Sequence, residues 1–391
     1  MLLLGVSTLG TLSSGAVAPV LPRFVEEELG GGGTLIGLVM GIPYLCSLLG
    51  GLLSGPQVDR LGRRVTALTG LSVALVGALL LIPADSAAIT ILARAVFGVG
   101  TGITATAIIT WAIDQVPREQ RGWALSVFGM TVWIGLSLGP QAGQAMFDVT
   151  GYRGVWAVIA GLEAAALVVV LAAREPVRLA VRRKAARPSG HNRLIPAGAV
   201  RPAVAIGMAA YGEGVITAFL VLQLIDRGVH GGAGFGGAAS VYTIFAVSVI
   251  VCRLGAARLI DGPRPELLAM AALAIEAAGL VVLAFASSFE AAAAGAAVMG
   301  GGFAVLFPAL ALLATQMSPE EERGAALGSF GSAFSLGLGM GALLGGAVAA
   351  VAGTGAAHLS AALAAATGAL VLGLARPRQS RLPVPLVERA P

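Results

Sequence analysis

The chain has 391 residues, of which 57% are hydrophobic and 12% are charged, whereas soluble proteins carry about 25% charged residues. Together with a mean hydropathy of +0.89, this balance excludes a soluble globular protein and places the chain in a bilayer. The net charge of +5 does not indicate a nucleic-acid partner, because the basic residues lie between apolar runs and form no single patch.

Twelve apolar runs along the chain are each long enough to cross a bilayer, which takes about 20 residues. Helices satisfy their own backbone in lipid, and the runs are far too long for barrel strands. The first run has no basic n-region and no A-x-A site, so we interpret it as a span and not as a cleaved signal. The sequence predicts an all-α membrane protein with twelve transmembrane helices, at about 2–22, 34–57, 65–84, 88–113, 122–147, 154–173, 199–224, 236–258, 266–286, 291–315, 324–352 and 357–375.

Lysine and arginine are unevenly distributed between the two sides of these spans. If both termini are cytoplasmic, all but four of the 25 basic residues fall on the cytoplasmic side. Arg23, Arg153 and Arg227 fall outside, and Arg94 lies within a span. This asymmetry predicts a multi-pass plasma-membrane protein with cytoplasmic termini. The longest loop, 174–198, is basic, and we interpret it as a linker that faces anionic lipid.

The second half of the chain repeats the first at an offset of 202 residues. Val116–Leu125 and Ser318–Leu327 share six residues at this offset, and the glycines of the fifth span recur in the eleventh. A constant register predicts two homologous six-helix bundles with a substrate site between them. The expected organisation is an N-terminal bundle 1–173, a linker 174–198, a C-terminal bundle 199–375 and a cytoplasmic tail 376–391.

A charged loop of the form G-x-x-x-D-R-x-G-R-R joins the second and third spans. Its composition indicates a tight turn with fixed ion pairs, and Asp114 at the end of the fourth span is the expected partner of one arginine. Ordinary solvated loop charges are the alternative. Shielded ion pairs that form in one conformation and break in another can bias a gate. The predicted gating residues are Gly55, Asp59, Arg60, Gly62, Arg63, Arg64 and Asp114, with Asp261 as the counterpart of Asp59 in the repeat.

Two ionisable residues inside spans are candidates for a proton or substrate pathway. Arg94 is one, because an arginine inside a span costs about 2.5–3.5 kcal/mol and such residues mark pathways. It lies near the outer end of its span, so snorkelling is a further alternative for it. Glu213 is the other, since flanking glycines allow close approach and an apolar setting lets a carboxyl load and release a proton. Structural pairing is the alternative for both. Glu163 and Glu276 are also intramembrane.

A stripe of glycines runs along one face of the fifth span, at Gly135, Gly139 and Gly143. Pro140 favours a kink there, and the repeat has Ala342 in its place. The stripe is read either as plain helix packing or as a seal against proton leak.

On these residues the chain resembles the major facilitator superfamily, and within it the twelve-span drug/proton antiporters. Gly55–Arg64 matches the family signature between helices 2 and 3, and Arg94–Gly100 is similar to R-x-x-q-G-x-G with Phe97 in place of Gln. Gly135–Gln144 resembles the antiporter motif G-x-x-x-G-P-x-x-G. The resemblance implies that helix 4 lines the cavity and that helices 6 and 9 are outer scaffold, so Glu163 and Glu276 are expected to be structural.

The expected function is a secondary transporter, most simply a proton-coupled exporter of small hydrophobic or amphipathic compounds. A metabolite importer, an uncoupled facilitator and a transport-inactive sensor remain alternatives. The expected partners are a small-molecule substrate, protons and lipid, with no obligatory oligomer. We expect no enzymatic activity, no cofactor and no metal, because the histidines are isolated and no nucleotide-binding loop or metal-ligand spacing occurs.

Overall fold

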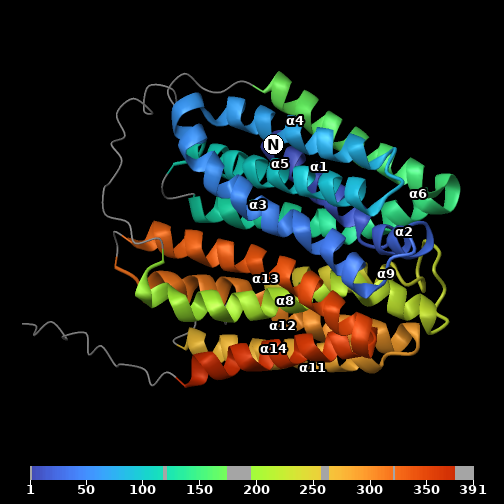
Figure 1. Cartoon of the computed structure of the whole chain (residues 1–391). Helices are drawn as coiled ribbons and strands as arrows, with labels where there is room; N and C mark the ends of the chain where they lie inside the picture. Colours follow the sequence, from blue (N-terminus) through green and yellow to red (C-terminus); the bar gives the residue numbers. More distant parts are fainter. Residues whose placement is uncertain (1, 118–120, 174–194, 257–263, 320–321, 375–391) are drawn as a thin grey trace, which may run out of the picture.

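The computed structural model describes residues 2–117, 121–173, 195–256, 264–319 and 322–374 (Figure 1). Asp261, most of the linker and the tail lie outside these residues, as does the side chain of Asp59. The described part of the first half contains α1 (Leu2–Val17), α2 (Leu21–Glu27), α3 (Gly33–Leu61), α4 (Arg63–Leu81), α5 (Ala87–Asp114) and α6 (Arg121–Ala172). That of the second half contains η2 (Ala197–Ala199), α8 (Val200–Asp226), α9 (Ser240–Gly255), α11 (Pro265–Phe285), α12 (Phe289–Gln316), α13 (Arg323–Ala352) and α14 (Thr354–Gly373).

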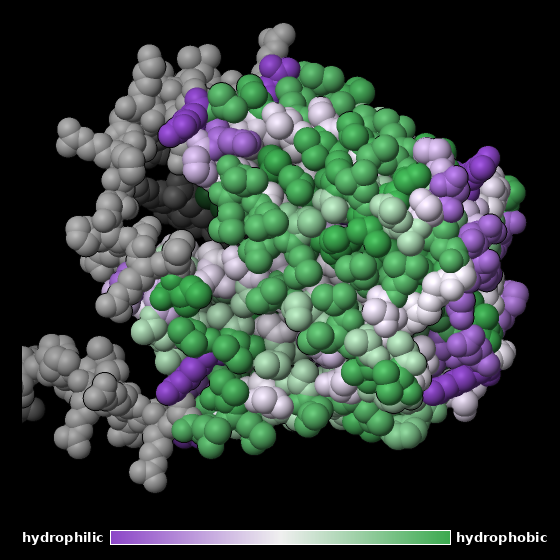
Figure 2. Space-filling model, in the orientation of Figure 1, coloured by the Kyte–Doolittle hydropathy of each residue, from purple (hydrophilic) through white to green (hydrophobic). Residues whose placement is uncertain are grey.

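These helices agree with the expected twelve spans. Ten segments of the described chain are long and apolar enough to cross a membrane, and α9 is a shorter apolar helix. One of the ten, α6, contains a non-helical residue, Gly151, and therefore consists of two successive helices. Counting both parts of α6 and adding α9 gives the twelve. The space-filling view shows a broad apolar surface with hydrophilic residues gathered toward the two ends, as a bilayer requires (Figure 2).

The first expected span, 2–22, is interrupted in the structure. Helix α1 ends at Val17, and α2 begins at Leu21. Pro19 has no N–H to continue the helical ladder, and it disfavours helical geometry in the residue before it. Short turns, in which the Ala18 and Val20 amides bond the carbonyls three residues earlier, replace the helix there.

Single glycines reverse the chain at equivalent places in the two halves. Gly151 has φ 67° and ψ −166°, and Gly353, which lies 202 residues later, has φ 84° and ψ 165°. A residue with a side chain rarely adopts this backbone conformation, so glycine permits the direct passage from one span to the next. The repeat that the sequence predicted therefore extends to the turn geometry.

The two halves lie side by side, with α1–α6 above and α8–α14 below in Figure 1. Helices α3 and α13 contact each other near the end of the molecule that carries α2, called here the α2 end. There, Gly33 and Gly37 approach the α13 backbone at Gly346, and Gly41 approaches it at Gly339. Farther along the same helices, several glycines have open space beside them. A Cβ added at Gly55, Gly324 or Gly328 would meet nothing within 4 Å.

The glycine stripes hold helices together within each half. In α6, Gly139 approaches α1 so closely that an added Cβ would lie 2.8 Å from the Gly15 Cα. In α13, Gly341 approaches α8 in the same way, with an added Cβ 2.8 Å from the Tyr211 Cα. Small residues at such contacts allow helices to pack backbone to backbone.

Candidate functional site

A few polar side chains from both halves lie within electrostatic range of Tyr44, near the contact of α3 with α8. This junction cluster consists of Tyr44 on α3, Arg94 on α5, Glu213 on α8 and Tyr242 on α9. Tyr44 interacts electrostatically with both Arg94 and Glu213, and it also interacts with Tyr242. The structure thus places one tyrosine, Tyr44, within electrostatic range of both intramembrane residues that the sequence singled out.

Arg94 is 6% exposed and is held by the neighbouring helix. Its Nε donates a hydrogen bond to the carbonyl oxygen of Val39 at 3.4 Å. That carbonyl lacks its helical partner, because the residue four positions later is Pro43, which has no N–H. Gly98, one turn from Arg94, packs directly against Pro43. The R-x-x-x-G pattern in α5 therefore matches a proline break in α3.

The guanidinium of Arg94 also lies 5.5 Å from the ring centroid of Phe97. Phe97 occupies the position where the resembled motif carries a Gln. An aromatic ring at this distance attracts a cation through its face. In this chain the Phe97 ring contacts Arg94 at the position where the motif has a polar Gln side chain.

Arg253 makes a matching contact in the second half, although its place in the sequence predicts a cytoplasmic charge. It lies within α9, and its Nε donates to the carbonyl oxygen of Ala304 at 3.1 Å. That carbonyl lacks a helical partner because Pro308 follows four residues later in α12. The guanidinium lies 6.0 Å from the ring of Trp133, which belongs to the first half. A span arginine together with a span proline on a neighbouring helix was the signal that could have identified it.

Glu213 lies at the junction with an incompletely satisfied carboxyl. It is 9% exposed, and its Oε2 has no hydrogen-bond partner among the described residues. Glu276 on α11 interacts with it electrostatically. Glu276 is fully buried, and neither of its carboxyl oxygens has a partner in the described part of the chain. The family resemblance predicts for Glu276 only a structural place in the outer scaffold.

Glu163 occupies a separate position in the first half. It is 1% exposed on α6 and lies beside Ser13 of α1. Its Oε1 has no hydrogen-bond partner among the described residues. It lies on the second helical part of α6, beyond the break at Gly151.

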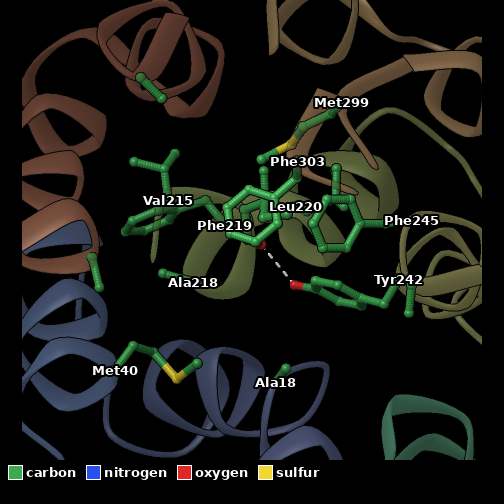
Figure 3. Packing of buried hydrophobic residues seen from close by; sticks show 14 of the residues in the cluster. Ala18, Met40, Val215, Ala218, Phe219, Leu220, Tyr242, Phe245, Met299 and Phe303 are labelled. Atoms are coloured by element: carbon green, nitrogen blue, oxygen red, sulfur yellow. Dashed lines mark hydrogen bonds between the residues drawn. The ribbon is translucent and has the colours of Figure 1, made fainter. Parts of the chain in front are cut away.

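Aromatic side chains join the halves beside the junction cluster. The Trp133 ring on α6 lies edge-on to Phe245 of α9 and Phe303 of α12, at centroid distances of 5.9 and 5.6 Å. Figure 3 shows Phe245 and Phe303 beside Tyr242, which points toward α8. The Tyr242 hydroxyl donates to the carbonyl oxygen of Ile216 at 2.6 Å. These contacts make the surroundings of the cluster largely apolar.

Further contacts between the halves lie toward the α2 end. The Thr243 hydroxyl donates to the Ser137 carbonyl at 2.8 Å. The Ala233 amide donates to Asp148 at 2.9 Å, and the Gly234 amide donates to Gln141 at 3.1 Å. The segment between α8 and α9 is therefore tied to α6.

The charged motif lies at the other end, around Gly62, which has φ 98° and links α3 directly to α4. Arg63 Nη2 is 2.8 Å from Asp114 Oδ2, so the predicted pairing of Asp114 with a motif arginine is present. Arg64 donates to the carbonyl oxygens of Val170 and Leu171 at 3.4 and 2.6 Å. These bonds satisfy carbonyls at the end of α6. The motif thus fastens the start of α4 to the ends of α5 and α6.

The other motif residues lie along the last turns of α3. Asp59 and Arg60 are within the helix, and Arg60 is exposed. Gly55 is also helical and has open space beside it. Over the described ranges, no group of three His, Cys, Asp or Glu side chains is placed to hold a metal ion.

Comparison with known proteins places this geometry in a family. A model described as Major Facilitator Superfamily matches residues 3–261 and, separately, 202–390. An uncharacterized MFS-type transporter of Burkholderia mallei (strain SAVP1) is 32% identical over 95% of this chain and 90% of its own length. Another, of Pseudomonas aeruginosa (strain UCBPP-PA14), is 30% identical over 96% of this chain and 92% of its own.

Solved structures share the fold at low sequence identity. The nucleoside transporter NupG aligns with a TM-score of 0.78 at 14% identity, over 95% of this chain and 98% of its own. The peptide transporter POT aligns with a TM-score of 0.78 at 15% identity, over 95% of this chain and 93% of its own. These likenesses concern the fold alone.

Proposed function

Because this chain belongs to the Major Facilitator Superfamily and is a membrane transporter, we propose that it exports small, partly apolar compounds in exchange for protons. The observation that carries the proposal is Glu213, a buried carboxyl with an unsatisfied oxygen at the junction of the two halves. Burial of an unpaired charge is costly, so a proton that binds to Glu213 removes this cost and stabilises the conformation in which the carboxyl is buried.

In this proposal the two halves, 1–173 and 199–375, move against each other. With both termini in the cytoplasm, the α2 end faces outward, and the α3–α13 glycine contacts close the outer side. The opposite state requires these contacts to separate and the region around Gly55 and Gly328 to close. The Arg63–Asp114 pair lies at that cytoplasmic end, where the motif would act as a gate.

Proton binding would select between these two states. A ligand shifts a conformational equilibrium only by its differential affinity for the two states. Glu213 can supply a difference in proton affinity because it lies at the boundary between the halves that move. Its neighbour Tyr44 interacts electrostatically with both Glu213 and Arg94. In one state the carboxyl would face its proton source, and in the other it would face the cationic and phenolic groups of the first half.

The apolar surroundings of the junction support the proposed substrate class. Trp133, Phe245 and Phe303 border the cluster, and polar groups are few. Sugars need many hydrogen-bond partners, whereas an apolar pocket with a few convergent polar groups suits amphipathic compounds.

The test uses purified protein in vesicles with a trapped pH-sensitive dye. A toxicity screen of overproducing cells first identifies a compound to which the protein gives resistance. We expect that compound to drive proton movement across wild-type vesicles, and we expect E213Q to lose this movement at normal insertion. E163Q is the matched control because Glu163 is also a buried span carboxyl but lies on α6, beside Ser13 of α1.

Other outcomes would contradict the proposal. Substrate flux without proton flux in the wild type indicates a facilitator. Ligand binding with neither flux indicates a sensor. Full proton coupling in E213Q removes Glu213 from the pathway.

A further inference from the structure

We propose that Glu213 and Glu276 bind protons as one unit, in which Glu276 sets the pH at which Glu213 is loaded. Glu213 lies at the junction of the halves, whereas Glu276 lies on α11, which packs against α12, α14 and α8 of its own half. Coupling between the two carboxyls needs no substrate, and only its consequence for transport rests on the proposed function.

Gly212 on α8 has no side chain, so the carboxyl of Glu276 can lie close to the α8 backbone next to Glu213. A Cβ added at Gly212 would lie 3.2 Å from Glu276 Oε1 and 3.0 Å from the Leu280 side chain. The Glu276 carboxyl therefore lies against the α8 backbone at the residue that precedes Glu213. Electrostatic interaction between the two glutamates agrees with this placement.

Neither carboxyl is fully satisfied by its described surroundings. Both oxygens of Glu276 and the Oε2 of Glu213 lack a hydrogen-bond partner there. Glu276 is 0% exposed and Glu213 is 9% exposed. A buried polar group without a partner costs about 1–3 kcal/mol, and more if it is charged. A bound proton neutralises one charge and adds a donor, which the pair otherwise lacks.

The titratable groups on the neighbouring helices have other partners or lie elsewhere. Tyr211 bonds Ser360 of α14 at 3.1 Å, and His358 bonds the Thr354 carbonyl at 2.9 Å. Further charged or titratable groups on these spans are Arg23, Glu26 and Glu27 on α2, Tyr44, Cys46, Asp59 and Arg60 on α3, Tyr242, Cys252 and Arg253 on α9, Glu290 in the first turn of α12 and Arg323 in the first turn of α13, and α8 and α11 themselves carry Arg201, Asp226 and Glu266. Of these, Tyr44 interacts electrostatically with Glu213, and Arg94 interacts with Tyr44. For the described residues, no ion pair to either glutamate is present.

Two like charges in this setting are coupled by their mutual repulsion. Protons then bind in macroscopic steps that belong to the pair and to neither residue alone. Glu276 acts here as a positioning residue. It lies on α11, which packs within its own half, and its charge determines how readily the junction carboxyl holds a proton.

The test follows carboxyl protonation directly by infrared spectroscopy of the purified protein in lipid discs, titrated with acid and with no substrate present. In the wild type we expect two coupled carboxyl steps, separated by at least about one pH unit. We expect E276Q to leave a single step for Glu213 at a changed midpoint, and E213Q to do the same for Glu276. An unchanged Glu213 midpoint in E276Q overturns the proposal.

E163Q is the control, because it removes a buried carboxyl from the other half and should leave both coupled steps in place. G212A keeps both carboxyls but places a methyl group against Glu276, so it should change the separation of the steps. G161A is its matched control, since a Cβ there meets nothing within 4 Å. Should E276Q fail to fold, an unchanged separation in G212A overturns the proposal. Because no substrate is used, a failure of proton-coupled export in vesicles leaves this result standing.

Discussion

In each half, an arginine on one helix donates a hydrogen bond to a backbone carbonyl that a proline leaves without its helical partner on a neighbouring helix. The helix that carries the arginine in one half corresponds to the helix that carries the proline in the other. In the first half, Arg94 on α5 donates to the carbonyl that Pro43 leaves free on α3. In the second half, Arg253 on α9, the counterpart of α3, donates to the carbonyl that Pro308 leaves free on α12, the counterpart of α5. The contact recurs although neither arginine has an arginine at the 202-residue offset. The need for a donor is thus met in both halves, but from opposite helices.

The halves also differ in the charges that they bring to the junction. The first half contributes the buried cation Arg94, and its buried acid Glu163 lies elsewhere. The second half contributes Glu213 with Glu276 behind it. The duplicated scaffold therefore carries different buried charges in its two halves.

Among substitutions that test the two arginine contacts, R94Q is expected to lower stability and transport the most. The change removes a buried charge from the junction and weakens the bond to Val39, and an unsatisfied buried carbonyl costs about 1–3 kcal/mol. We expect a lower thermal midpoint in detergent and loss of transport. P43A supplies a backbone N–H to the same carbonyl, so P43A/R94Q should recover stability but not transport.

R153Q, at an exposed position, controls for the loss of an arginine alone. If R94Q and P43A/R94Q are equally unstable, the proline-break explanation of Arg94 is wrong.

A smaller effect is expected from R253Q. Arg253 is partly exposed and its contact to Trp133 is long at 6.0 Å, so we expect a loss of about 1–2 kcal/mol. P308A should restore most of it, as measured by thermal unfolding of the purified protein. Recovery in the first half without recovery in the second would break the parallel between the two arginines.

The smallest effect on stability is expected from D114N. The pair with Arg63 has side-chain exposures of 14% and 20%, so water screens it in part and its loss should cost about 1 kcal/mol. Under the gating proposal, transport should fall far more than stability. Transport by D114N vesicles that matches the wild type would remove Asp114 from the gate. The roles of Asp59 and Asp261 remain predictions.

The membrane class, the twelve spans and the duplication can all be inferred from the amino-acid sequence alone. Apolar length, glycine spacing and a constant offset are local properties that a linear chain displays directly. Composition also identified Arg94 and Glu213, since a charge within an apolar run is conspicuous at any position, and it indicated that Asp114 would meet a motif arginine, which Arg63 proved to be.

Which of these residues lie close together depends on how the helices pack. Glu276 acquires its place beside Glu213 because Gly212 presents no side chain to α11, a fact about helix rotation that spacing does not encode. Arg253 acquires its role because an unpaired carbonyl lies across a helix contact in α12. Partners on different helices are selected by packing, and packing depends on the whole set of side chains at once.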